Sequence, residues 1–284
     1  MIEFPELVRI PLRDWIDSIM SWLLTNLDGF FDAIGWAILQ VMLGFEALFT
    51  FIPWFLFIPI IFIAGWRMLK SLIGGIVMAL MLFLIGAFGY WDMAMKTLSL
   101  VSASVLFSLL IGIPTGIYMA QSDRAESVIK PMLDGMQTMP SFVYLIPALM
   151  FFGLGRVPAV IATIIYAVPP VIRLTNVGIR TVDPEAVEAA KAFGAKRKQV
   201  LWDVQLPLAK PAIMVGINQT TMMALAMVVI GSMIGAKGLG MEVLLSINRI
   251  EVGRGFEAGI SIVFLAIIID RLTHSVSGRS DQNQ

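Results

Sequence analysis

Cysteine is absent from the 284-residue chain, which excludes disulfides and thiolate metal sites. Charge is also scarce: 14% of the residues are charged and the formal net charge is zero, so the composition predicts no nucleic-acid partner. The single histidine, His274, cannot form the His-Glu-x-x-His metal motif. The phosphate-binding motif Gly-x-x-x-x-Gly-Lys-Ser/Thr does not occur either, so no nucleotide site is expected in this chain.

Apolar residues dominate the composition. They make up 58% of the chain and the mean hydropathy is +0.86, a balance typical of an integral membrane protein. Runs long enough to cross the hydrocarbon core recur along the chain. They lie at 47–66, 71–89, 97–120, 132–153, 157–177, 211–235 and 256–272. The sequence therefore predicts an all-α, polytopic membrane protein with about seven transmembrane helices, and residues 46–273 as its transmembrane domain.

Lysine and arginine set the expected orientation, because the side of a membrane that is richer in them is cytoplasmic. The larger share lies on one side, at 67–70, 124–130 and 173–210 and in the tail from Arg271. That side is expected to be cytoplasmic. Residues 274–284 then form a cytoplasmic tail, and the N-terminus lies outside.

Residues 1–45 are interpreted as a separate amphipathic or interfacial segment. Trp15 and Trp22 share one face of a predicted helix, whereas Asp14 lies on another. Such a helix either lies in the membrane interface or packs on the rest of the protein. The apolar stretch 31–45 is either a second surface helix or a further span, and a further span would move the N-terminus inside.

Proline and glycine mark irregular points in the expected spans. Proline removes an amide donor and interrupts a helix, and its density between Pro140 and Pro170 indicates a pathway lined by neighbouring helices. Gly112 and Gly116 have the spacing that lets two helix backbones approach closely. Packing within the chain is the preferred interpretation of that spacing.

A polar, basic insert at 178–210 separates two apolar segments. Asp183 can cap a helix, Pro184 suits the first helical position, and Gly194 can end the helix in a left-handed conformation. A second helix is expected at 196–205. Because the insert lies on the expected cytoplasmic side, it is either a solvated loop or a surface on which a partner docks.

The first helix of this insert has a pattern suited to docking. Its apolar stripe consists of Ala186, Ala189, Ala190 and Phe193. Glu185 and Glu188 lie near its positive N-terminal end. Because alanine side chains are small, the helix is thin and its backbone can lie deep in a cleft of a partner.

One motif in the insert runs Glu188-Ala189-Ala190, three residues, Gly194, nine residues, Val204, one residue, Leu206-Pro207. This spacing resembles the EAA loop of ABC importer permeases, with valine in place of the usual isoleucine. The resemblance implies the type I ABC importer permease fold, in which this loop is the coupling helix that sits in a groove of a cytoplasmic ATPase subunit. It implies that Glu188, Ala189, Ala190 and Gly194 contact the ATPase. Glu185 and Phe193, which belong to the same helix pattern, complete the predicted set of ATPase-coupling residues.

Further stretches between about 95 and 273 narrow the resemblance. They are Gly135–Pro147, Val168–Thr175, Gly216–Gln219, Ala224–Ile230 and Gly238–Gly240. They resemble the glycine betaine/proline/choline permease subfamily of the bacterial cytoplasmic (inner) membrane. The resemblance implies uptake of glycine betaine, proline betaine, choline or a related quaternary amine by alternating access. ATP and Mg²⁺ would be bound by the partner ATPase, so the chain itself is expected to be no enzyme and to hold no cofactor.

The resemblance implies three further partners. A substrate-binding protein on the extracytoplasmic side is expected to be a separate polypeptide, because the chain ends soon after the last span. A second copy of the permease is expected, since one ATPase dimer offers two grooves. Membrane lipid surrounds the spans.

Polar and aromatic groups at membrane depth are the candidates for a translocation path, because such groups face a cavity or another helix. One cluster comprises Gln137, Thr138, Ser141 and Tyr144, and the other Asn218, Gln219, Thr220 and Thr221. For each residue singly, an interhelical hydrogen bond is the competing interpretation.

Two other classes of protein compete with an ABC permease. An ion-gradient-driven secondary transporter of small zwitterions would need charged ion sites within the membrane, and the spans between 97 and 172 carry almost none. Asp270 and Arg271, at a span end, are interpreted as an interfacial ion pair. An intramembrane enzyme would need a catalytic histidine or paired carboxylates at depth, whereas His274 follows the last span.

Overall fold

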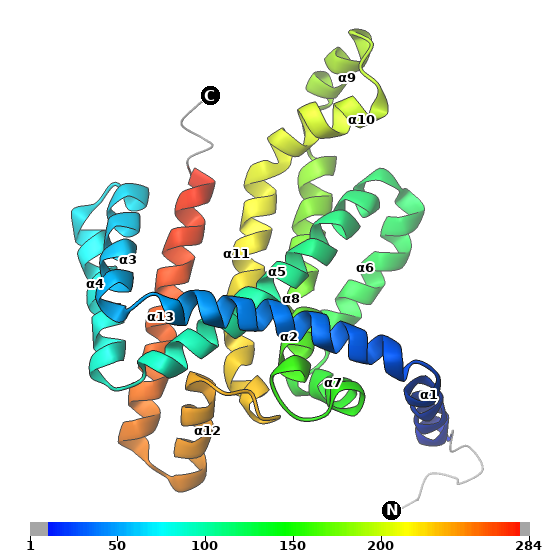
Figure 1. The fold of residues 1–284 in the computed structure, drawn as a ribbon. Helices are drawn as coiled ribbons and strands as arrows, with labels where there is room; N and C mark the ends of the chain where they lie inside the picture. The colour runs from blue at the N-terminus through cyan, green and yellow to red at the C-terminus, as the bar shows by residue number, and fades with distance from the viewer. Residues whose placement is uncertain (1–10, 279–284) are drawn as a thin grey trace, which may run out of the picture.

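The computed structural model describes residues 11–278, with side chains described through residue 274, and these residues form helices and short connections (Figure 1). The N-terminal elements are α1 (Leu12–Asn26), α2 (Asp28–Phe51), α3 (Trp54–Leu69), α4 (Leu72–Ala87) and α5 (Trp91–Gln121). The middle of the chain forms α6 (Asp123–Thr138), the 3₁₀ turn η2 (Ser141–Tyr144), α7 (Leu145–Phe152) and α8 (Arg156–Arg180). The remainder forms α9 (Pro184–Ala192), α10 (Arg197–Gln199), the π-helical turn η3 (Val200–Gln205), α11 (Leu206–Ser232), α12 (Leu239–Arg249) and α13 (Val252–Gly278).

Five helical segments are long and apolar enough to cross a membrane. They are Asp28–Phe51, Trp91–Gln121, Arg156–Arg180, Arg197–Ser232 and Val252–His274. The bent pair formed by α6 with η2 and α7 brings the number to six, and α3 and α4 are shorter apolar helices. The predicted all-α membrane architecture is confirmed, with fewer full-length spans than the seven expected.

The span expected at 47–66 is wrong, because the chain is broken within it. α2 ends at Phe51, and Pro53 adopts an extended conformation before α3 begins at Trp54. Proline lacks the N–H that a continuing helix would need. α2 itself runs continuously through residue 45, so the stretch 31–45 is the middle of a longer helix.

The span expected at 132–153 is also wrong as a single helix. α6 and the η2–α7 segment meet at 110°. Met139, which precedes Pro140, is extended, because a proline disfavours the helical conformation of the residue before it. By contrast, Pro114 and the Pro169-Pro170 pair lie inside the helices α5 and α8, which continue through them.

α8 lies at the centre of the bundle, with 67% of its apolar window buried. It packs on one side against α5 and on another against α11. Gly116 of α5 makes the first contact possible: a Cβ there would lie 2.6 Å from the Cβ of Thr175 and 2.7 Å from the carbonyl oxygen of Ile172. Gly112 is equally close to Val171, so the predicted close helix approach is confirmed within the chain.

The elements have two distinct ends (Figure 1). The α3–α4 turn, the α5–α6 turn, the insert with α9 and α10, and the C-terminal end of α13 lie at one end, whereas α7, α12 and the α4–α5 turn lie at the other. The basic stretches 67–70 and 124–130 therefore share an end with the insert. α2 runs across the bundle instead of along it (Figure 1), and it contacts α5, α7 and α8.

Candidate functional site

The first part of the insert is the short helix α9, whose two ends are well defined. The side chain of Asp183 accepts a hydrogen bond from the Glu185 N–H at 2.9 Å, and Pro184 occupies the first turn of α9. Gly194 adopts a left-handed φ of +82° and donates its N–H to the Lys191 carbonyl at 2.9 Å. The predicted N-terminal cap and the left-handed glycine that follows the helix are both confirmed.

The second part of the insert joins directly to α11. Only Arg197–Gln199 is α-helical, and η3 then continues with the wider π spacing, in which the Leu206 N–H bonds to the Leu201 carbonyl five residues back. The separate helix expected at 196–205 is thus the beginning of one long helical segment, Arg197–Ser232. Single π turns within α-helices occur frequently at functional sites.

The residues predicted for docking lie mostly on the outer face of α9. Glu185, Glu188 and Ala189 are exposed, and Phe193, just after the helix, is 93% exposed. This ring lies beside the exposed side chains of a polar insert, so a partner that docks on the outer face of α9 would cover it. The carboxylate of Glu188 forms no hydrogen bond or ion pair with any residue that the structure describes.

The inner face of α9 holds the insert to the bundle. Val187 packs against a cluster of buried residues from the ends of α8 and α11, Ile179 and Ala209 among them. Ala186 and Ala190 are half-buried, so the predicted alanine stripe is divided between the inner and outer faces. Arg197 also donates to the carbonyl of Gln121, the last residue of α5, at 3.0 Å.

A second connection between the helix ends comes from Arg180, at the end of α8. Its guanidinium lies 2.7 Å from Asp123 and 3.2 Å from Glu126, both in the first turn of α6. It also donates to the carbonyl of Met119 in α5 at 3.0 Å. Val187 thus packs α9 against the ends of α8 and α11, and the bonds of Arg180 join α8 in turn to α5 and α6.

The first cluster of path candidates lies at the bend between α6 and α7. Gln137 and Thr138 are exposed, and Ser141 is half-buried. Tyr144 is buried, and its hydroxyl donates to the carbonyl of Met136. The Tyr144 hydroxyl therefore stabilises the bend between α6 and α7. The role of this cluster in lining a translocation path stays a prediction.

The second cluster is spread over several faces of α11. The Asn218 side chain donates to Asp270 of α13 at 3.0 Å, so Asp270 links α13 to α11. Among the described side chains, Asp270 forms no ion pair with Arg271, the partner that the sequence analysis assigned to it. Thr221 lines a cavity of about 330 Å³ between α5, α11 and α13. Thr220 is buried and Gln219 exposed.

Several polar groups within the bundle escaped the sequence analysis. The hydroxyls of Ser108 and Thr175 are buried and, like that of Thr220, have no partner among the described residues. Arg156 of α8 forms an ion pair with Glu46 of α2, and Arg173 of α8 pairs with Asp134 of α6. Sequence patterns could not pair these charges, because Glu46 and Asp134 lie 110 and 39 residues away from their partners along the chain.

The end opposite the insert carries a buried ion pair. Glu242 of α12 has a side chain only 6% exposed, and it lies 2.6 Å from Arg254 of α13, which also pairs with Glu251 at 3.1 Å. Burial, with the charge of Glu242 as the next cause, raises the pKa of Tyr90 nearby. Beside this pair, Ile250 adopts a left-handed φ of 58°. A β-branched residue strains the backbone in that conformation.

A family model matches the chain from residue 112 to residue 281, which includes α8, the insert and α11. That family is described as the binding-protein-dependent transport system inner membrane component. The chain belongs to this family. It is thus a component of a transport system located in the inner membrane, as the sequence predicted.

Individual relatives extend the likeness over nearly the whole chain. The glycine betaine/carnitine transport permease protein GbuB of Listeria monocytogenes is 47% identical, over 97% of this chain and 99% of its own length. The glycine betaine transport system permease protein OpuAB of Bacillus subtilis is 44% identical, over 95% of both chains. The glycine betaine/proline betaine transport system permease protein ProW of Escherichia coli is 45% identical, over 97% of this chain and 77% of its own.

Among solved structures, the chain is similar to a chain of the MetNI methionine ABC transporter in an inward-facing conformation. The TM-score is 0.60 at 19% identity, and the match covers 65% of this chain and 93% of that one. At this identity the likeness concerns the fold alone. The predicted type I ABC importer permease fold is confirmed.

Proposed function

We propose that this chain is the permease subunit of an ATP-driven importer for glycine betaine, proline betaine, choline or a related quaternary amine. The observation that carries the substrate class is the full-length similarity to relatives named as glycine betaine permeases. Because this chain lacks a phosphate-binding motif, ATP and Mg²⁺ belong to a cytoplasmic ATPase subunit.

The outer face of α9 is the proposed contact with that ATPase subunit. It combines the exposed carboxylates of Glu185 and Glu188 with the exposed ring of Phe193. The same contact includes the residues assigned to it by their position in the motif, which are Glu188, Ala189, Ala190 and Gly194. Because the inner face of α9 packs on α8 and α11, closure of an ATPase dimer would move these helices and reopen the path outward.

The remaining partners follow from the same proposal. A separate extracytoplasmic protein delivers the ligand at the end opposite the insert, and a second copy of the permease completes the path. Gln137, Ser141, Asn218 and Gln219 are the polar groups that we assign to that path, together with the other members of their two clusters. The path itself needs only weak, passable contacts, since tight binding of a quaternary ammonium belongs to the delivering protein.

The experiment uses the natural absence of cysteine. The full-length chain carrying Ala189→Cys is purified from native membranes in mild detergent, with Asn248→Cys, an exposed site on α12, as the matched control. We expect a co-purifying ATPase whose activity is stimulated by the binding protein with glycine betaine, and which cross-links through position 189 only. An eluate without ATPase, and without a cross-link at position 189, would refute the proposal.

A further inference from the structure

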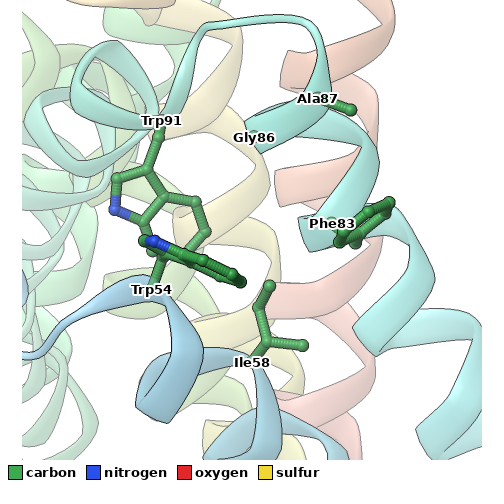
Figure 2. A pocket seen from close by; sticks show the side chains of 6 residues that line it. All are labelled: Trp54, Ile58, Phe83, Gly86, Ala87 and Trp91. Atoms are coloured by element: carbon green, nitrogen blue, oxygen red, sulfur yellow. The ribbon is translucent and has the colours of Figure 1, made fainter.

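An apolar pocket opens at the end of the bundle opposite the insert, where the ends of α3, α4 and α5 meet (Figure 2). It has a volume of about 310 Å³. The pocket is lined by Trp54, Ile58, Phe83, Gly86, Ala87 and Trp91. None of these side chains carries a charge, and apart from two indole N–H groups the lining is apolar, so most of a ligand that enters the pocket must be apolar.

The sequence creates this pocket by placing two small residues opposite large rings. Gly86 and Ala87 lie one turn beyond Phe83 on α4, and a Cβ on Gly86 would stop 3.7 Å from the ring of Trp91. Trp91 is held from behind by Phe57, whose ring lies edge-on to it with centroids 5.7 Å apart. A larger residue at position 86 would fill the space.

The pocket has a polar side and an apolar side. Figure 2 shows the indole nitrogens of Trp54 and Trp91 on the same side, pointing away from Phe83. Neither indole N–H donates a hydrogen bond to any residue between 11 and 278. A ligand that satisfies both sides is an amphiphile, with hydrogen-bond acceptors at one end and hydrocarbon at the other.

We propose that this pocket binds one acyl chain of a membrane phospholipid, whose ester or phosphate oxygens accept hydrogen bonds from Trp54 and Trp91. Tryptophan is suited to this position because its ring is apolar while its N–H seeks a polar partner at the membrane surface. At roughly 30 Å³ per water-sized group, the pocket holds about ten such groups, which corresponds to part of one acyl chain.

The surroundings of the pocket support a lipid as its occupant. The outward faces of both helices are apolar and exposed, with Ile60 and Ile63 on α3 and Leu80 on α4. In a membrane these faces contact hydrocarbon, so the pocket opens onto the same layer. A small quaternary cation fits less well, because no carboxylate lines the pocket to offset the loss of its hydration.

Quenching of tryptophan fluorescence by brominated lipid tests the proposal. The full-length chain is reconstituted in vesicles of phosphatidylethanolamine and phosphatidylglycerol, and the latter is replaced stepwise by an analogue with brominated acyl chains. The double variant Trp54→Phe/Trp91→Phe isolates, by difference, the fluorescence of the two pocket rings. Trp66→Phe isolates in the same way a ring of α3 that is 48% exposed and lies outside the pocket.

We expect half-maximal quenching of the pocket rings at an about fivefold lower fraction of brominated lipid than for Trp66, the ratio that one additional hydrogen bond supports. Gly86→Leu should abolish this difference. Gly44→Leu, at an exposed position on α2 with no atom within 4 Å, should preserve it. Ala87→Leu provides a second way to fill the pocket should Gly86→Leu alter the gel-filtration profile.

Two results would overturn the proposal. One is a pocket component that is quenched like Trp66, or that keeps its preference when position 86 or 87 is filled. The other is a response of the pocket component to choline chloride without any to brominated lipid, which would assign the pocket to a small cation. Both measurements use the permease alone, without an ATPase or a binding protein, so a failure here is distinguishable from a failure of the proposed transport function.

Discussion

The replacement Glu188→Ala separates the fold of the insert from its proposed function. Glu188 is exposed and without an intrachain partner among the described residues, so its loss should change the free energy of unfolding by no more than about 0.5 kcal/mol. Asp183 and Gly194, which define the two ends of α9, remain in place. Any large effect on transport must then arise at an interface with another chain.

The expected size of that effect follows from the chemistry of a carboxylate at an interface. A hydrogen bond to a charged group contributes about 1.5–3 kcal/mol, so its loss should weaken coupling by roughly tenfold to a hundredfold. The assay is ATP hydrolysis by the assembled complex in vesicles, with and without the binding protein loaded with glycine betaine. Uptake of radiolabelled glycine betaine is measured in the same vesicles.

The matched control is Glu257→Ala, which removes an exposed glutamate at the opposite end of the bundle, in α13. We expect this variant to hydrolyse ATP and transport substrate as the original chain does. Equal stimulated hydrolysis and uptake in the Glu188→Ala complex would refute the assignment of α9 as the coupling contact. A fall in both, accompanied by a lower unfolding temperature, would instead show that Glu188 stabilises the fold.

Further replacements test the packing. Gly116→Ala should destabilise the chain by about 1–3 kcal/mol, because the added methyl group overpacks the contact of α5 with α8. The control Gly44→Ala, on the exposed side of α2, should be neutral or stabilising. Equal midpoints of thermal unfolding in detergent for the two variants would contradict the close α5–α8 contact. Ile250→Asn should stabilise the chain by about 1 kcal/mol, because asparagine tolerates the left-handed conformation, and a lower midpoint would argue against strain there. Arg254→Ala should lower the unfolding midpoint, because it leaves the buried Glu242 unpaired, and adding Glu242→Gln should restore part of the loss. No recovery in the double variant would mean that the charge of Glu242 is not the cause.

The insert could be predicted from the sequence because its structure depends on local interactions. Asp183 accepts from an N–H two residues away, and Gly194 bonds three residues back. Interactions between residues only two or three positions apart leave a recognisable pattern in the amino-acid sequence. Which face of α9 points outward was harder to predict from the sequence, because it depends on the packing of Val187 against residues of α8 and α11.

The course of the spans was harder to predict, because hydropathy gives no information on direction. Pro140 was visible, yet the 110° turn at this point is maintained by Tyr144, which bonds back to Met136. Pro169 and Pro170 looked like breaks, but neighbouring helices enclose α8 and it stays continuous. The partner of Asn218 was equally hidden, since Asp270 lies 52 residues further along the chain.

The unbroken segment from Arg197 to Ser232 has a mechanical consequence. Its 36 residues extend for about 50 Å along the chain at 1.5 Å per residue. Figure 1 shows the segment changing direction where η3 meets α11, so the straight part is α11, whose 27 residues extend for about 40 Å. A tilt of about 5° at the insert end of α11 then gives a shift of roughly 3–4 Å at its far end. There the hydroxyl of Ser232 donates to the carbonyl of Gly240 at 3.1 Å, so the shift would reach α12 directly. A displacement of the insert at the cytoplasmic end would then be transmitted through α11 to α12 at the opposite end of the protein.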